Sequence, residues 1–374
     1  MFDLNLPKLG FGLMRLPEKD KNIDVEQLKK MVDDYIDAGF NYFDTAYMYC
    51  EGKSENAIKE ALVDRYSRDS YFLVDKLPIW MTNENKNKED IFNDQLNKVG
   101  VDYFNLYLLH SIDDESIEQY EKEDCFNWIK NKKEQGFIQH YGFSFHGSPE
   151  TLDKILNDHP DVEIVQIQLN YADWENPVVQ SGKCYEVLRK HNKPILVMEP
   201  VKGGLLANLP SEVGTLMKEY NEEASLASWA LRFASSLPNV VTVLSGMSNE
   251  EQMKDNLKTY TNFKPMTKEE YQIISKVIDI LVNDKKVGCT NCKYCMDNCP
   301  MQIKIPEIFK LLNLKRVNKG DWQAQGHYDD LIKESGKASA CLQCGQCEGV
   351  CPQHLSIIQL LEEATNYFEG EKHD

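Results

Sequence analysis

The sequence has no surplus of basic residues and no long apolar run. Its 374 residues include 42 Lys and Arg against 60 Asp and Glu, which gives a formal charge of -18 at pH 7. Nucleic-acid binding needs a basic surface, so this balance argues against it. The first residues, MFDLNLPKLGFG, lack the basic start and apolar run of a signal peptide, and no apolar run reaches the length of a membrane span. We therefore expect a soluble, cytoplasmic protein that binds neither nucleic acid nor membrane.

Disulfide bonds are also not expected, because clustered cysteines in a reducing compartment bind metals. Eight of the eleven cysteines lie in two segments, CTNCKYCMDNCP and CLQCGQCEGVCP. Both have the spacing Cys-x2-Cys-x2-Cys-x3-Cys-Pro, which is the ligand pattern of ferredoxins with two [4Fe–4S] clusters. The predicted ligands are Cys289, Cys292, Cys295, Cys299, Cys341, Cys344, Cys347 and Cys351.

In such motifs the fourth cysteine binds the other cluster. The spacing therefore predicts one cluster on Cys289, Cys292, Cys295 and Cys351, and a second on Cys341, Cys344, Cys347 and Cys299. Two alternatives remain open. Each motif could hold a structural zinc ion, although zinc sites usually separate two Cys-x2-Cys pairs by a longer loop. The clusters could also serve only to stabilise a small domain with little core of its own.

The first two-thirds of the chain alternate short apolar segments with amphipathic patterns. Eight buried strands are expected at 8–14, 42–46, 71–77, 103–110, 140–146, 164–170, 194–200 and 240–246. A helical pattern follows each of them. This α/β alternation predicts a (β/α)8 TIM barrel, with a doubly wound sheet as the alternative.

Helices are expected at 24–38, 54–64, 87–99, 124–134, 149–158, 182–191, 223–235 and 249–259, and one more over 267–283. Asp24, Ser54 and Asn249 stand where N-caps belong. A break at Lys264-Pro265-Met266-Thr267 predicts a boundary there. We expect the barrel over residues 1–265 and a small α-helical ferredoxin-like domain with two clusters over residues 266–374.

Four polar residues fall at or just after the ends of consecutive predicted strands, where barrel enzymes build active sites. They are Asp44, Tyr49, Lys76 and His110. Carbonyl reduction needs a proton for the oxygen, and the ordinary pKa of Tyr, about 10, is high for an acid at neutral pH. A Lys76 cation held by Asp44 would lower that pKa, and His110 would orient the carbonyl oxygen. Any one of these residues alone could be structural.

The segments FDTAYMY followed by GKSE, DYFNLYLLH and VLSGMSNEEQMKDN resemble the aldo-keto reductase family over roughly residues 8–260. The paired cysteine motifs resemble those of family members with a fused ferredoxin domain. The resemblance implies a catalytic tetrad of Asp44, Tyr49, Lys76 and His110, with Tyr47 as the competitor for the acid. It also implies NADP or NAD as the cofactor and a small-molecule carbonyl compound as the substrate.

The resemblance further implies a nucleotide site built from several loops. Ser144 and Gln166 match positions that hold the carboxamide, and Lys202, Gly203, Gly204 and Leu205 match a backbone that meets the pyrophosphate. Gly246, Met247 and Ser248 open a phosphate-binding helix on which Gln252 and Asn256 face the adenosine. Phe145 and Met198 depart from the usual Asn and aromatic residue. The altered pocket could instead take FMN.

Nicotinamide transfers hydride, whereas a [4Fe–4S] cluster transfers single electrons, so a direct link between them needs a converter such as a flavin. Three hypotheses follow for the function. The chain is a reductase whose clusters exchange electrons with a ferredoxin-like or other redox partner; or an ordinary NAD(P)H carbonyl reductase with structural or docking clusters; or a non-catalytic electron-transfer or redox-sensing module.

Overall fold

The computed structural model describes residues 6–281, 286–317 and 322–370. The chain divides into two compact units. One comprises Met1–Val201 and Gly214–Ile274, and the other comprises Lys202–Val213 and Ser275–Asp374.

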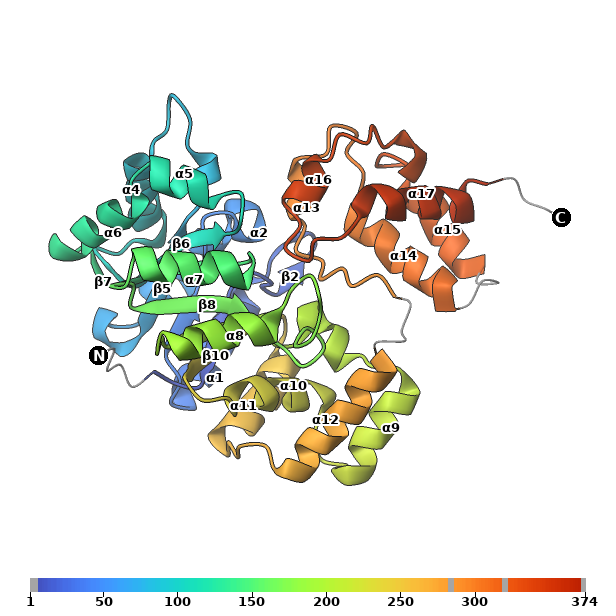
Figure 1. Cartoon of the computed structure of the whole chain (residues 1–374), viewed down its shortest axis with the longest axis horizontal. Coiled ribbons are helices and arrows are strands. Elements are labelled where there is room, and N and C mark those ends of the chain that lie inside the picture. The colour runs from blue at the N-terminus through green and yellow to red at the C-terminus, as the bar shows by residue number, and fades with distance from the viewer. Residues whose placement is uncertain (1–5, 282–285, 318–321, 371–374) are drawn as a thin grey trace. The chain divides into compact units, whose positions relative to one another are not determined.

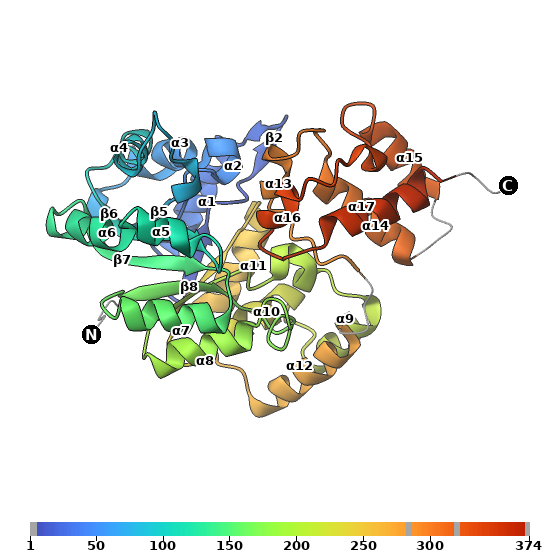
Figure 2. The ribbon, with the colours of Figure 1, turned by 45° about the horizontal axis from the view of Figure 1, so that its top comes forward.

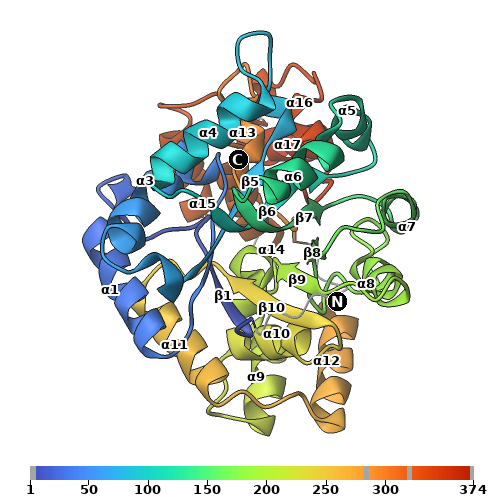
Figure 3. The same cartoon turned by 90° about the vertical axis from the view of Figure 1, so that its left-hand side faces the viewer.

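The first unit contains a closed barrel of eight parallel strands (Figure 3). The strands are β1 (Leu9–Gly12), β4 (Tyr42–Asp44), β5 (Phe72–Leu77), β6 (Phe104–Ile112), β7 (Ile138–Phe145), β8 (Ile164–Gln168), β9 (Ile195–Met198) and β10 (Val240–Ser245). Around the barrel they follow the order β1-β10-β9-β8-β7-β6-β5-β4, so each strand pairs with the next barrel strand in the chain and the last, β10, closes on β1. All eight predicted strand segments are confirmed, and with them the (β/α)8 fold.

Helices surround these strands (Figures 1 and 3). The longer ones are α1 (Val25–Asp37), α4 (Lys88–Val99), α6 (Cys125–Glu134), α7 (Pro149–Asp158), α8 (Ser181–Lys190), α10 (Leu226–Ser235), α11 (Glu250–Thr261) and α12 (Lys268–Leu281). The predicted helix 54–64 is α3 (Ser54–Ile58) continued by one π turn, η1 (Lys59–Val63). Residues 282 and 283 of the last predicted helix lie outside the described residues.

Several short elements have no counterpart among the sequence predictions. They are β2 (Glu18–Lys19), β3 (Asn22–Ile23), α2 (Tyr49–Gly52), η2 (Arg68–Ser70), η3 (Ile79–Met81), α5 (Ile117–Lys122), η4 (Lys202–Ala207) and α9 (Ser211–Tyr220). Most of them lie in loops between a strand and the following helix. Except for α9, which has ten residues, these segments carry too few residues for a periodic pattern to appear in the sequence.

Two of the three predicted N-caps are confirmed. Asp24 accepts a hydrogen bond from the Gln27 amide, and Asn249 accepts one from the Gln252 amide. The prediction for Ser54 is wrong, because this residue is the first of α3 and its hydroxyl donates to the Leu13 carbonyl at 3.0 Å instead. The hydrogen bond to the Leu13 carbonyl therefore takes the place of the N-cap hydrogen bond that the sequence predicted for Ser54.

An apolar layer fills the barrel below the ends of the strands. It consists of Tyr42, Phe72, Val74, Leu106, Leu108, Ile164, Leu196 and Leu244, all buried. Side chains two residues apart in a strand point to the same face. Asp44, Lys76 and His110 each follow a member of this layer by two residues, so their side chains belong to the next layer toward the carboxyl ends of the strands.

The second unit is helical and has an apolar core of its own. Its elements are α13 (Tyr294–Asp297), α14 (Ile305–Val317), α15 (Trp322–Leu331), η5 (Ala338–Ala340), α16 (Gln346–Gly349) and α17 (Ile357–Phe368). Helix α14 packs against α15 and α17, while the two short helices α13 and α16 contact each other (Figures 1 and 2). The core includes Ile308, Phe309, Leu312, Tyr328 and Leu361. No helix in the described part of the chain is both long and apolar enough to cross a membrane.

Candidate active site and metal centres

Asp44 and Lys76 form a buried ion pair at the carboxyl end of the barrel. The Lys76 Nζ lies 2.5 Å from Asp44 Oδ1 and donates to the Thr45 carbonyl at 2.6 Å. Burial raises the pKa of Asp44, and the Lys76 charge opposes that rise. Removing one partner of such a pair typically costs about 3–5 kcal/mol, since it leaves an uncompensated buried charge. The pair therefore holds the lysine side chain in one place.

Tyr49 lies beside this pair, where the backbone bends sharply. The Lys76 Nζ is 4.8 Å from the centre of the Tyr49 ring, and the side chain is 8% exposed. The two residues that follow, Cys50 and Glu51, have φ of 53° and 57°, which is rare for residues with a side chain. Strained backbone of this kind is often found at functional sites.

The surroundings of Tyr49 make its phenol a weaker acid, not a stronger one. Burial first and the Asp44 charge second raise its pKa well above the usual value, while Arg15 acts in the opposite direction. The predicted lowering of this pKa by Lys76 is therefore wrong for the protein alone. The physical reason is that Asp44 compensates the lysine charge while burial disfavours the phenolate.

His110 completes the group and is held as a neutral imidazole. Its ring is 6.0 Å from the Tyr49 ring and 5.2 Å from the Trp80 ring. Burial, followed by the charges of Lys76 and His146, lowers its pKa well below the usual value. A neutral imidazole carries one N–H that can donate to a carbonyl oxygen. The four predicted residues of the tetrad are thus brought together by β4, β5, β6 and the loop after β4.

Tyr47, the competing tyrosine, has different partners. Its hydroxyl donates to Asp94 Oδ2 at 2.6 Å and accepts from the Lys86 ammonium. The Lys98 ammonium lies 3.8 Å from the centre of its ring. Asp94 and Lys98 belong to helix α4, so Tyr47 faces the helix layer and is engaged there. This leaves Tyr49 as the tyrosine beside Lys76.

The predicted carboxamide contacts are adjacent in the barrel. Ser144 on β7 and Gln166 on β8 are paired in register, and both are buried. The Ser144 hydroxyl accepts a hydrogen bond from the Ser111 amide at 2.6 Å, which leaves its own O–H free to donate. Gln166 Oε1 is buried without a hydrogen-bond partner among the described residues. A carboxamide, which has one acceptor and two donors, fits this pair.

The predicted phosphate residues lie in the turn after β10, the predicted adenosine residues lie on α11, and some of them bind one another. Gln252 Oε1 accepts from the Ser248 amide at 2.8 Å, and Asn256 Nδ2 donates to Ser245 Oγ at 2.6 Å. Asn256 is buried, as is Met247. A Cβ atom added at Gly246 would lie 3.8 Å from the Cβ of Arg15. Arg15, which the sequence reasoning missed, lies beside this loop and pairs with Glu199 at 3.6 Å.

The predicted pyrophosphate loop, Lys202 to Leu205, packs within the second unit against a cysteine motif. The Lys202 ammonium donates to Gln353 Oε1 at 3.2 Å. Gly203 has φ of 62°, and a Cβ there would lie 2.5 Å from the Thr290 carbonyl oxygen. Thr290 and Gln353 flank the first and the last of the predicted ligands of one cluster. The sequence carried no signal for this contact.

Two cavities of the second unit are each lined by four of the eight predicted ligands. The first holds about 320 Å³ of open space and is lined by Cys289, Cys292, Cys295 and Cys351. The second holds about 340 Å³ and is lined by Cys299, Cys341, Cys344 and Cys347. In each cavity three thiols come from one motif and the fourth from the other. Ile305 lines both cavities, so they are neighbours.

The donor atoms around these cavities suit an iron–sulfur cluster. Backbone amides point at three sulfurs: Asn291 to Cys289, Ile303 to Cys299, and Gln343 to Cys341, at 3.4–3.5 Å. Such N–H···S bonds tune cluster potentials. Burial first, and then the neighbouring Cys341, raises the pKa of Cys347 to about 11. Bound iron would reverse this effect, since a coordinated thiol loses its proton.

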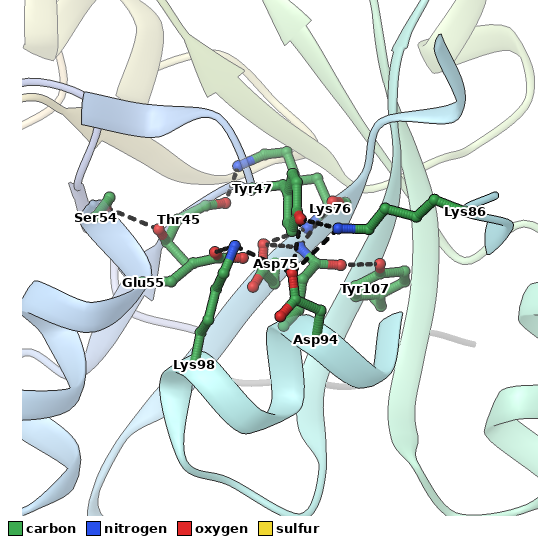
Figure 4. A network of polar contacts seen from close by, with 11 residues as sticks. Thr45, Tyr47, Ser54, Glu55, Asp75, Lys76, Lys86, Asp94, Lys98 and Tyr107 are labelled. Carbon is green, nitrogen blue, oxygen red and sulfur yellow. Dashed lines mark hydrogen bonds and ion pairs between the residues drawn. The ribbon is translucent and has the colours of Figure 1, made fainter. Parts of the chain in front are cut away.

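A further pair of buried acids was missed by the sequence reasoning. Glu55 follows the serine of the GKSE segment, and Asp75 directly precedes Lys76. Both are fully buried and face helix α4 (Figure 4). An acidic residue inside an otherwise apolar strand was the available signal, because buried carboxylates are rare without partners.

Comparisons with known proteins agree with this geometry. Residues 8–279 match the Aldo/keto reductase family, and residues 288–356 match the 4Fe-4S dicluster domain. The uncharacterized oxidoreductase YqkF of Bacillus subtilis is 24% identical over 309 residues, which cover 73% of this chain and 92% of that protein. Aldo-keto reductase family 1 member C21 of Rattus norvegicus is 26% identical over 289 residues, covering 68% and 84%.

Among solved structures, the holo form of aldo-keto reductase AKR11C1 from Bacillus halodurans has a TM-score of 0.58 and 25% identity, covering 72% of this chain and 91% of that one. An aldo-keto reductase from Klebsiella pneumoniae in complex with NADPH has a TM-score of 0.59, with coverage of 73% and 91%; at 18% identity it shows the fold alone. Because the family match spans well over half of its length, the chain belongs to the aldo/keto reductase family of oxidoreductases, and a 4Fe-4S dicluster domain follows at its C-terminal end.

Proposed function

We propose that the protein reduces the carbonyl group of a small aldehyde or ketone with NADPH or NADH, and that its C-terminal unit carries two [4Fe–4S] clusters that exchange electrons with a ferredoxin-like or other redox partner. The observation that carries the reductase assignment is the buried Asp44–Lys76 pair, at 2.5 Å, beside Tyr49 and His110. These groups meet at the carboxyl ends of the strands, where barrel enzymes act.

The nicotinamide, when bound, supplies a hydride to the substrate carbon. Ser144 and Gln166 would hold its carboxamide, as the buried and unpartnered Gln166 Oε1 supports. The neutral His110 donates to the carbonyl oxygen and stabilises the negative charge that develops there. Tyr49 then delivers its proton to this oxygen. Its raised pKa keeps the phenol protonated until that step, and the transfer is still favourable because an alkoxide is a stronger base than a phenolate.

Each cluster would be held by three cysteines of one motif and one of the other, as the two lined cavities support. Two observations favour electron transfer over a purely structural role. Most of the apolar core of the second unit consists of aliphatic and aromatic side chains, although it also includes Cys295 and Cys347, so metal is not the only source of packing. The two cavities share Ile305 in their walls, so clusters held there would be neighbours, as electron transfer between them requires.

FMN in the nicotinamide pocket is the second candidate. It is favoured by Phe145 and Met198, which replace the usual Asn and aromatic residue at the ends of β7 and β9. A flavin at this place would convert between hydride and single-electron transfer, which a nicotinamide does not do. The substrate would remain a small carbonyl compound.

Purification of the full chain without oxygen tests both versions. Under the main proposal, the protein contains iron and acid-labile sulfide and oxidises NADPH or NADH with at least some of a panel of aldehydes and ketones. Under the FMN version, it also carries a flavin and reduces the same compounds with reduced viologen alone. Protein with intact clusters that reduces no carbonyl compound with any of these donors would overturn the proposed function.

A further inference from the structure

A second buried polar group lies behind Lys76, on the outer face of the barrel wall. Asp75 precedes Lys76 in β5, so the two side chains point to opposite faces of the strand. Lys76 points into the barrel, and Asp75 points toward helices α3 and α4, where it meets Glu55 (Figure 4). Both carboxyl groups are 0% exposed.

This acidic pair has too few donors for two full negative charges. Glu55 Oε1, Glu55 Oε2 and Asp75 Oδ2 are buried and have no hydrogen-bond partner among the described residues. The Lys98 ammonium is 3.4 Å from Glu55 Oε2, but it lies closer to Asp94, at 3.2 Å. Lys76, on the other face, is bound to Asp44.

The groups that face the pair come from each neighbouring element. They are Lys76 on β5, Lys98 and Asp94 on α4, Tyr107 on β6, and Tyr47 before α2. Burial raises the pKa of Glu55, while burial and then the Glu55 charge raise that of Asp75. Adjacent carboxyl groups in such a place commonly share one proton, because like charges at short range cannot both persist without solvent.

Asp75 connects this pair to the backbone of Lys76. Its Oδ1 accepts from the Lys76 amide at 2.8 Å and from Gln95 Nε2 at 2.7 Å. Gln95 Nε2 also donates to the Lys76 carbonyl at 3.0 Å, and the Tyr107 hydroxyl donates to Gln95 Oε1. The amide and the carbonyl of Lys76 are therefore both held by side chains from outside the barrel.

We propose that Glu55 and Asp75 hold one proton between them, and that this proton-sharing pair is a positioning device for Lys76. A proton between the two carboxyl groups joins two of the three unpaired oxygens in a hydrogen bond and keeps Asp75 in place against the Lys76 amide. Gln95 holds the carbonyl of Lys76 through the hydrogen bond from its Nε2. The catalytic part of this proposal rests on the proposed function, whereas the shared proton does not.

The shared proton is tested without any substrate. Infrared spectra of the full chain at neutral pH should contain the C=O stretch of a protonated carboxyl group that is lost in both Glu55→Gln and Asp75→Asn. Asp44→Asn serves as the control, since it changes another buried acid and should leave this band in place. Wild-type protein whose spectrum lacks any band sensitive to both substitutions would overturn the proposal, whether or not the protein reduces carbonyl compounds.

Stability against pH gives a second readout of the same proton. A carboxyl group whose pKa is raised in the folded state stabilises the fold fully at low pH and loses that contribution as the pH rises through the folded value. Glu55→Gln cannot ionise at this position. Its thermal stability relative to wild type should therefore increase as the pH rises from the ordinary pKa of a glutamate, 4.5, through the raised pKa of the folded state. A difference that is independent of pH would contradict a raised pKa at Glu55.

The positioning role is tested by a pair of variants at one residue. Asp75→Ala removes the acceptor for the Lys76 amide and should lower kcat by roughly 10- to 100-fold with little change in KM, since small misplacements of catalytic groups have effects of this order. Asp75→Asn keeps an acceptor oxygen and should restore most of that rate. If Asp75→Ala does not fold, Gln95→Met carries the same expectation. Equal loss in the Ala and Asn variants, or no loss in Ala or Met, would refute the role.

Discussion

Tyr49 and Tyr47 stand two residues apart and have opposite surroundings. Tyr49 lies beside the Lys76 ammonium and the His110 ring inside the barrel mouth. Tyr47 donates to Asp94 and lies under Lys98, both on helix α4. At the scale of single residues, these two tyrosines are therefore a matched pair for testing the acid.

We expect Tyr49→Phe to lower kcat for carbonyl reduction by about 100-fold or more, because general acid catalysis commonly contributes 10²–10⁴-fold. Tyr47→Phe should keep most of the activity, since its hydroxyl binds the helix layer. Steady-state kinetics with one aldehyde and NADPH, together with circular dichroism to check folding, measures both. If both substitutions lowered kcat equally, Tyr49 would not be the general acid.

Among the elements, the turn η4 after β9 packs against the loop that contains Cys289 in the second unit. Gly203 and Gly204 have φ of 62° and 95°, so both favour glycine. They differ in their surroundings. A Cβ at Gly203 would lie 2.5 Å from the Thr290 carbonyl oxygen, next to Cys289, whereas a Cβ at Gly204 would have no neighbour within 4 Å.

Gly203→Ala should therefore displace the Cys289 loop, whereas Gly204→Ala should only add backbone strain, of order 1 kcal/mol. The expected result is faster loss of iron from Gly203→Ala than from Gly204→Ala when the anaerobic protein is exposed to a chelator. Thermal unfolding of the two full-length variants provides the control for general destabilisation. Equal rates of iron loss would mean that the contact with Thr290 does not support the cysteine loop.

Across the second unit, the two cysteine motifs form one framework. Each cavity takes three thiols from one motif and one from the other, so neither motif completes a site alone. This arrangement brings cysteines that are about 50 residues apart in the sequence to the same cavity. The second unit is therefore expected to gain stability from cluster binding, as metal sites that form only in the folded state do.

Two double substitutions separate this crossed ligation from ligation within each motif. Cys299→Ala with Cys341→Ala removes two ligands of one cavity and should leave about half of the iron, with the other cluster intact. Cys299→Ala with Cys289→Ala removes one ligand from each cavity and should perturb both clusters. Iron content and the electron paramagnetic resonance of the reduced protein distinguish them. The reverse result would show that each motif binds its own cluster.

Much of the fold and part of the site follow from local patterns. Short, continuous apolar segments predict the eight buried strands, and amphipathic period-3.6 patterns predict the helices, because burial acts on each element separately. Asp44, Lys76 and His110 are found by their place at strand ends, and the cysteines by their spacing. These inferences use only local patterns and require no information about contacts between residues that are distant in the sequence.

The barrel, the strand-end positions of Asp44, Lys76 and His110, and the thiol motifs follow from spacing along one or two elements. The different partners of Tyr47 and Tyr49, the meeting of Glu55 with Asp75, and the packing of Gly203 on Thr290 depend on the folded chain. The tertiary structure also decided the direction of the Tyr49 pKa, because the loss of hydration on burial and the compensation of Lys76 by Asp44 depend on the packed surroundings and not on residue type.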